Sequence, residues 1–284
     1  MPGPQISFLP DGRRLHLHHG PIDLIIAADG PGRAAGLARA ARRFDTLLAE
    51  LAAELPQLRR PVTDRCILQG RVARAMQRAA LAHAHVFVTP MAAVAGAVAD
   101  EILAAICADD GLRRVHVNNG GDVAFHLVPG AELTAAIAAP NLPRITLHAA
   151  GCTRGMATSG WRGRSLSLGI ADSVTVLART AARADVAATL IANAVDLPGH
   201  AAVRRAPANQ LFADSDLGDR PVTVDVAALG PDEVARALGR GQRLAESCLA
   251  RDLITGAVLT LGPACRVVAA PDLLTAFEKD RIHA

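Results

Sequence analysis

The segment at residues 117–125, VNNGGDVAF, restricts the fold of this chain more than any other. Two asparagines, two glycines and an aspartate separate short runs of apolar, β-prone residues. Asn-Gly and Gly-Asp in this setting are typical of a tight turn between two antiparallel strands. We therefore expect a hairpin here, and glycines without a Cβ would also let a ligand approach the main chain.

Helical and strand-like segments alternate irregularly along the rest of the chain. Apolar periodicity predicts helices over residues 34–55, 71–85, 91–111, 183–194 and 231–250, with Pro56 ending the first. Strands are expected over residues 13–29 as a pair, 86–90, 113–119, 122–128, 133–140, 165–178, 221–229, 256–261 and 265–270, with a polar loop at 155–165. This mixture predicts an α+β fold with mixed or antiparallel sheets, organised as one domain over residues 1–284.

Composition argues against several classes of function. The most apolar stretch is interrupted by Pro90, Asp100 and Glu101, so a membrane span is not expected. A formal net charge of +3, one Trp and no Tyr give little basis for binding nucleic acid.

The cysteines and the amino terminus indicate a compartment. Five cysteines are spread along the chain without a C-x-x-C pair, which fits reduced thiols and does not favour zinc. The amino terminus shows no secretion signal or lipid anchor, so we expect a cytoplasmic protein. The oligomeric state cannot be read from the sequence.

Two further segments carry oxygens that could meet a phosphate or a metal. In residues 155–165, Thr158, Ser159 and Gly160 precede Arg162 and Arg164, the ingredients of a phosphate site, although a polar turn explains them as well.

Asp185 and Thr189 are four residues apart, so on a helix their oxygens share one face and would suit Mg²⁺. A charge near a helix N-terminus beside a filler threonine is the alternative interpretation of this pair.

Taken in order, these motifs resemble the ApbE superfamily of flavin transferases. They are MAAVAGAVADEI, VNNGGDVAF, ATSGWRGRS and SVTVLARTAARADVAATLIANAV. The wider chain, through phrases such as HGPIDLII and DSDLGDRPVTVDV, resembles an uncharacterised short, cytoplasmic branch of that superfamily.

The resemblance implies an ApbE-like α+β fold that binds FAD, with Mg²⁺ between the diphosphate and the protein. It assigns the metal to Asp185 and Thr189. It places the flavin nucleotide near eight residues: Asp100, Asn119, Gly120, Gly121, Asp122, Thr158, Ser159 and Gly160.

Two departures from the transferase pattern concern catalysis. Residues 161–172, WRGRSLSLGIAD, lack the H-I-x-D-P-x-T-G motif, and Ala95-Gly96 stands where the transferases have A-K-G. We therefore expect flavin binding first and assign no catalytic residue. The alternatives are an Mg²⁺-dependent FMN transferase with an acceptor protein or an FAD diphosphate hydrolase, with Arg162 or Arg164 replacing the lysine. A third is a scaffold that binds another small metabolite.

Overall fold

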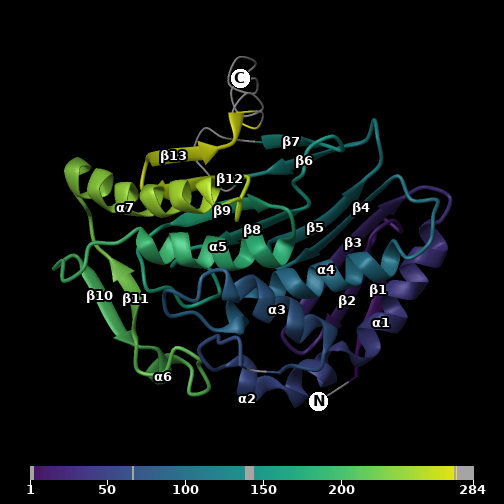
Figure 1. Ribbon diagram of the computed structural model, residues 1–284, viewed down its shortest axis with the longest axis horizontal. Helices are drawn as coiled ribbons and strands as arrows, with labels where there is room; N and C mark the ends of the chain where they lie inside the picture. The colour runs from purple at the N-terminus through teal and green to yellow at the C-terminus, as the bar shows by residue number, and fades with distance from the viewer. Residues whose placement is uncertain (1–2, 66, 138–143, 272, 274–284) are drawn as a thin grey trace. The chain divides into compact units, whose positions relative to one another are not determined.

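The computed structural model describes residues 3–65, 67–137, 144–271 and 273 (Figure 1). The chain forms two compact units. Unit 1 comprises Met1–Leu133, Leu147–Ala157 and Arg179–Asp185, and unit 2 comprises Thr134–Thr146, Thr158–Ala178 and Val186–Ala284. The expectation of one domain stays a prediction. Cys66 and the end of the strand expected at 133–140 lie outside the described residues.

Unit 1 is built on an antiparallel sheet with the order β1-β2-β3-β4-β5-β8. Its strands are β1 (Gln5–Phe8), β2 (Leu15–His19), β3 (Ile22–Asp29), β4 (Arg114–Asn119), β5 (Asp122–Leu127) and the first part of β8 (Gly155–Ser159). Leu17 lies opposite Leu24, and Ile26 lies opposite Val117, and all four are completely buried. Because side chains alternate between the two faces of a strand, a slip of one residue would expose this set and is disfavoured.

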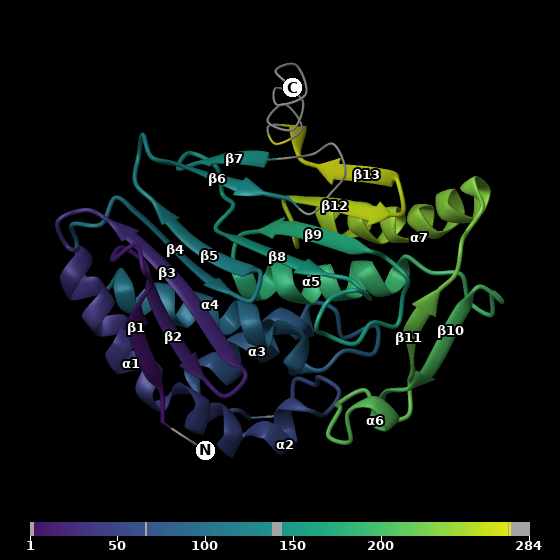
Figure 2. The same cartoon turned by 180° about the vertical axis from the view of Figure 1, so that it is seen from behind.

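Helices cover one face of this sheet, as the front and back views show (Figures 1 and 2). They are α1 (Arg33–Ala53), which contacts β2 and β3, and α4 (Val94–Ile106), which contacts β4 and β5. Two shorter helices, α2 (Leu55–Leu58) and η1 (Pro90–Ala93), and α3 (Arg71–Leu81) complete the unit. Phe44 and Leu47 of α1 are fully buried, and each side chain of this size contributes about 1.5–3 kcal/mol by leaving water.

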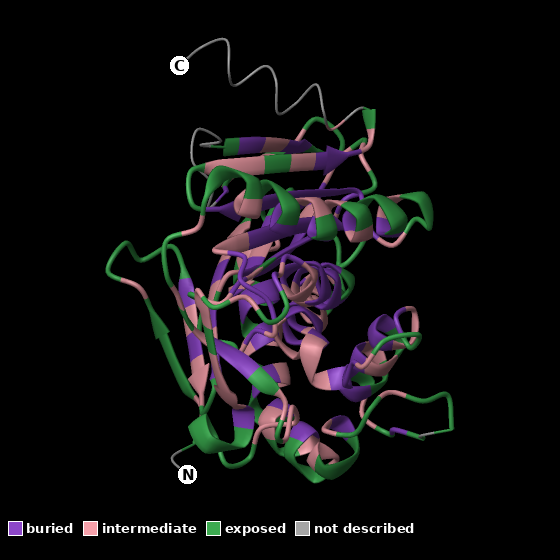
Figure 3. Ribbon diagram, turned by 90° about the vertical axis from the view of Figure 1, so that its left-hand side faces the viewer, coloured by how far each residue is buried: buried purple, intermediate pink, exposed green. Residues whose placement is uncertain are grey.

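Unit 2 contains the antiparallel strands β9 (Ser173–Ala178), β12 (Gly256–Leu261) and β13 (Ala264–Ala269). Helix α7 (Pro231–Ala250) packs on β12 and β13. Two strand pairs are separate: β6 (Glu132–Ala136) with β7 (Arg144–His148), and β10 (Val203–Pro207) with β11 (Pro221–Val226). The unit also contains α6 (Ala208–Leu211), and helix α5 (Ala181–Ala194) begins in unit 1 and continues in unit 2. Buried positions follow the strands and the inner helix faces (Figure 3).

The α+β class is confirmed, and several predicted elements are corrected. Pro56 lies in the first turn of α2, where its missing N–H costs no hydrogen bond, so it begins a helix instead of ending one. The helix expected to reach residue 85 ends at Leu81, and residues 86–90 form no strand. Within 165–178 only Ser173–Ala178 is a strand.

Four short strands were not predicted. They are β1, β7, β8 and β10, and β8 occupies part of the segment expected to be a polar loop. All are only four or five residues long; β1 and β7 alternate polar and apolar residues, whereas β8 and β10 do not. β1, β7 and β10 pair with the strand next to them along the chain, whereas β8 pairs with the more distant β5. Within the described residues, no helix has the length and apolar character needed to cross a membrane.

Candidate functional site

The predicted hairpin is present as β4 and β5, joined by a two-glycine turn. Gly120 has a φ of 63° and Gly121 a φ of 117°, which glycine adopts without strain. The side-chain oxygen of Asn118 accepts a hydrogen bond from the Gly121 N–H at 2.8 Å. A Cβ added at Gly121 would meet no atom within 4 Å. The main chain at this turn is therefore open to approach.

Asn119 attaches the hairpin to the start of α4. Its Nδ2 donates to the carbonyl of Ala95 at 3.1 Å, and its Oδ1 accepts from the Asp23 N–H at 3.4 Å. The side chain is buried, with 7% of the residue exposed. Asn119 was predicted beside a ligand, and its amide is engaged in holding the turn against the helix.

The first turns of α4 and α5 meet in unit 1 through two exchanged carboxylates, which we call the carboxylate exchange. Asp100 of α4 accepts from the N–H groups of Ala181 and Ala182 at 3.0 and 2.9 Å. Asp185 of α5 accepts from the Gly96 N–H of α4 at 3.0 Å. Each acid thereby satisfies backbone donors at the start of the other helix, where negative charge is also favoured by the helix dipole.

Gly96 makes this close approach possible. A Cβ at Gly96 would lie 2.7 Å from the nitrogen of Ala182 and still closer to the carbonyl of Ala181. These atoms belong to the backbone, so no change of rotamer could relieve the overlap. The glycine that precedes Asp100 by four residues is therefore required by helix packing.

The acidic side chains of this region perturb one another. Burial raises the pKa of Asp100 to about 6, although two N–H groups oppose the shift. Burial also raises the pKa of Asp185 well above its usual value, and the negative charges of Asp122 and Asp100 raise it further. Asp122 is itself buried, with 8% of the residue exposed. A cation near Asp185 would offset this repulsion and favour the ionised carboxylates.

Few side chains in this region could bind a metal ion. Within the described ranges, no group of three or more His, Cys, Asp or Glu side chains is arranged to hold a metal ion. Mg²⁺ needs only one or two protein carboxylates, because water and phosphate oxygens complete its shell. Thr189 follows Asp185 by one turn of α5 and is half-buried, so both oxygens project from one helix face.

The predicted residues Thr158, Ser159 and Gly160 belong to unit 2, at and just after the end of β8. The hydroxyl of Thr158 lies 2.8 Å from that of Thr175. A Cβ at Gly160 would come within 2.9 Å of the carbonyl of Ala171, which accounts for the glycine by packing alone. A role for these three residues in ligand binding stays a prediction.

Arg162, expected as a possible replacement for the missing lysine, has a partner within unit 2. Its Nε lies 2.6 Å from an oxygen of Asp172, and its guanidinium lies 4.7 Å from the centre of the Trp161 ring. An ion pair and a ring contact thus already hold this side chain.

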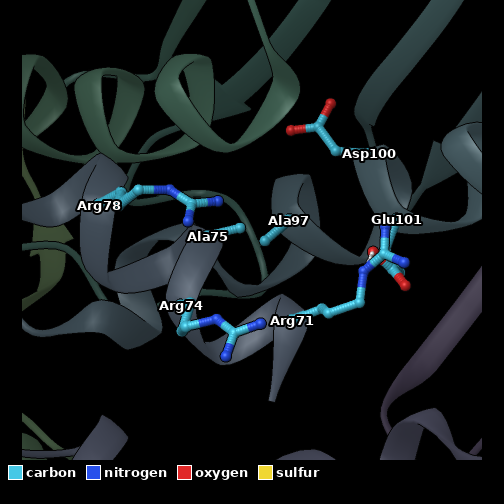
Figure 4. Close-up of a pocket in the computed structure, with 7 residues that line it drawn as sticks. All are labelled: Arg71, Arg74, Ala75, Arg78, Ala97, Asp100 and Glu101. Carbon is cyan, nitrogen blue, oxygen red and sulfur yellow. Dashed lines mark ion pairs between the residues drawn. The ribbon is translucent and has the colours of Figure 1, made fainter. Parts of the chain in front are cut away.

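Sequence reasoning missed a second charged feature of unit 1. Arg71, Arg74 and Arg78 of α3 line a hollow of about 220 Å³ that is also lined by residues of α4, Asp100 among them (Figure 4). The signal was present in RVARAMQR, because arginines three and four residues apart share one helix face.

Comparisons with known proteins cover nearly the whole chain. A family model described as "AbpE bacteria" matches residues 6–267. A UPF0280 protein of Methanopyrus kandleri is 36% identical over 203 residues, which covers 69% of this chain and 79% of that protein. A UPF0280 protein of Methanothrix thermoacetophila is 39% identical over 113 residues, which covers 38% of this chain and 46% of that protein.

One solved structure is similar at a low level. It is the apo form of the Pseudomonas stutzeri flavinyl transferase ApbE, with a TM-score of 0.44 and 12% identity over 97% of both chains. At this TM-score the likeness supports no conclusion about ligand or reaction.

Proposed function

Because the chain belongs to the AbpE bacteria family, and thus to the ApbE-like superfamily, we propose that it binds a flavin nucleotide, FAD, together with Mg²⁺. The observation that carries the proposal is the carboxylate exchange, which brings Asp100 and Asp185 together in unit 1, where the charge of Asp122 also acts on Asp185. Three acids whose charges oppose one another are better accommodated when a divalent cation is bound.

Each residue has a role in this proposal that follows from its contacts. Asp185 and Thr189 would hold Mg²⁺, which neutralises the charge of a diphosphate when it is bound. Gly120 and Gly121 would let the nucleotide lie against the open main chain of the turn, and the carboxylate oxygens of Asp122 would accept hydrogen bonds from it.

Asp100 and Asn119 would position the residues that bind the ligand. Asp100 holds the first turn of α5, which carries Asp185, and Asn119 holds the hairpin against α4. Both side chains already have hydrogen-bond partners, so they would orient the binding groups instead of contacting the nucleotide.

The test is a calorimetric titration of the purified protein with FAD, with and without Mg²⁺. Wild-type protein should bind FAD more tightly when Mg²⁺ is present. Asp185→Asn should remove at least about tenfold of that gain, since a metal ligand is lost. An asparagine oxygen can still accept from the Gly96 N–H, so the variant should fold. Asp232→Asn, which removes an exposed charge from the first turn of α7, is the matched control.

The outcomes separate the proposal from its rivals. If wild-type protein binds no FAD in the presence of Mg²⁺, flavin binding is wrong. If Asp185→Asn binds FAD in the presence of Mg²⁺ as tightly as wild-type protein does, the assignment of Mg²⁺ to Asp185 fails. Release of AMP from FAD, or FMN-labelled acceptor protein, would establish the enzymatic alternatives. They rank below binding alone because residues 161–172 contain no histidine that could transfer a proton.

A further inference from the structure

A hollow of about 220 Å³ lies between α3 and α4 within unit 1 (Figure 4). The residues that line it are Arg71, Arg74, Ala75, Arg78, Ala97, Asp100 and Glu101. We call it the arginine hollow. Figure 4 shows Ala75 and Ala97 between Arg78 and Asp100, where their short side chains leave the space open.

The three arginines form one exposed face of α3. They are three and four residues apart, so their side chains project in the same direction. The Nε of Arg71 lies 3.5 Å from an oxygen of Glu101, but the guanidinium groups of Arg74 and Arg78 have no hydrogen-bond or ion-pair partner among the described residues. Like charges at this spacing destabilise a helix, so an anion bridging them would be favoured.

The two acids of the hollow are occupied by other donors. Asp100 accepts from the N–H groups at the start of α5, in the carboxylate exchange. Glu101 receives the Nε of Arg43 at 2.7 Å on one oxygen and faces Arg71 with the other. Arg74 and Arg78 therefore keep their charge available for a ligand.

We propose that the arginine hollow binds a diphosphate group. Planar guanidinium groups donate paired hydrogen bonds to phosphate oxygens, and two or three of them match a group with several negative charges. The volume is below the roughly 300–1,000 Å³ typical of pockets for drug-sized ligands, so it suits a small anion or the anionic end of a larger molecule. The proposal does not depend on flavin binding, because free diphosphate and the diphosphate of a nucleotide share the chemistry that the arginines would recognise.

The test uses inorganic pyrophosphate alone, in the presence of a chelator and at low ionic strength. Calorimetry compares wild-type protein with the double variant Arg74→Gln, Arg78→Gln. The matched control is Arg236→Gln, Arg240→Gln, which removes two exposed arginines at the same spacing from α7. Wild-type and control should bind equally, and the hollow variant should lose about tenfold in affinity for each arginine removed.

A second variant separates a shaped site from diffuse charge. Ala75→Leu fills the hollow without changing its charge, and leucine is a good helix former, so α3 should persist. Ala75→Leu should weaken pyrophosphate binding at least about tenfold, because the leucine side chain would fill the space in which the anion binds. Urea unfolding of every variant confirms that each is folded.

The inference is wrong if wild-type protein binds no pyrophosphate, or if the hollow variant and the α7 control lose affinity equally. A parallel titration with FAD and Mg²⁺ identifies the source of the anion. A matching loss of FAD affinity in the hollow variant assigns the diphosphate to the nucleotide, and unchanged FAD affinity assigns it to a free anion. FAD binding without pyrophosphate binding would overturn this inference and leave the proposed function standing. Pyrophosphate binding without FAD binding would support this inference and overturn the proposed function.

Discussion

Gly96→Ala should destabilise the protein by pushing apart the first turns of α4 and α5. The new methyl group would lie 2.7 Å from the nitrogen of Ala182, where ordinary contacts begin at 3.4 Å, and closer to the Ala181 carbonyl. The helices must therefore separate by roughly 1 Å, as in other overpacked contacts. That movement would lengthen the hydrogen bond from the Gly96 N–H to the Asp185 carboxylate, whose N···O distance is 3.0 Å, beyond hydrogen-bonding range.

The magnitude follows from three effects. Overpacking of a fixed contact costs about 1–3 kcal/mol, and losing a hydrogen bond to a charged group costs about 1.5–3 kcal/mol. Alanine returns about 1 kcal/mol through its higher helix propensity. The net expectation is a loss of about 1.5–5 kcal/mol in the free energy of unfolding.

Urea unfolding at neutral pH measures this loss, and the chain supplies a matched control. Gly239 lies inside α7, and the nearest atom to an added Cβ is the Nη1 of Arg243, at 3.8 Å on a flexible side chain. Gly239→Ala should therefore stabilise the protein by about 0.5–1 kcal/mol. The same substitution thus has opposite signs at two helical positions. A Gly96→Ala midpoint at or above that of wild type would refute the close contact between the helices.

Three further outcomes are expected. Because the pKa of Asp100 rises from 3.8 to about 6 on folding, its contribution to stability falls as the pH rises from about 4 to 6. Urea unfolding across this range should therefore show the free energy of unfolding falling as the pH rises, and Asp100→Asn should reduce that total fall by up to about 3 kcal/mol. An unchanged pH dependence in the variant would count against the buried acid. Gly121→Ala should cost about 1–3 kcal/mol without any ligand, because its φ of 117° strains any side chain; a wild-type thermal midpoint would contradict this. Bulky substitutions at Gly121 are therefore expected to lower stability even when no flavin is bound. Asp122→Asn should lower the pKa of Asp185 by removing a neighbouring negative charge, a shift that carbon-detected NMR titration of the Asp185 carboxyl can follow.

Local sequence patterns were enough to predict those elements whose conformation depends on neighbouring residues. The VNNGGDVAF turn needs two positive φ angles, and two adjacent glycines supply them, so the hairpin could be predicted without the rest of the chain. Helix α7 begins at Pro231, directly after Gly230, and has the predicted bounds, because its start and stop signals are also local. The ordered motifs likewise indicated the ApbE-like superfamily.

Which polar groups come into contact depends on tertiary packing, which no local pattern reports. Asp100 and Asp185 are far apart in the chain, and their exchange of helix ends depends on how closely two backbones pack at Gly96. The short polar strand β8 forms by pairing with β5, which no local pattern reports. The spacing of Arg74 and Arg78 was visible in the sequence, but the hollow that they line depends on α4 packing beside α3. Local patterns fix the conformation of a segment, whereas burial, pKa and cavities depend on contacts between segments distant in the chain.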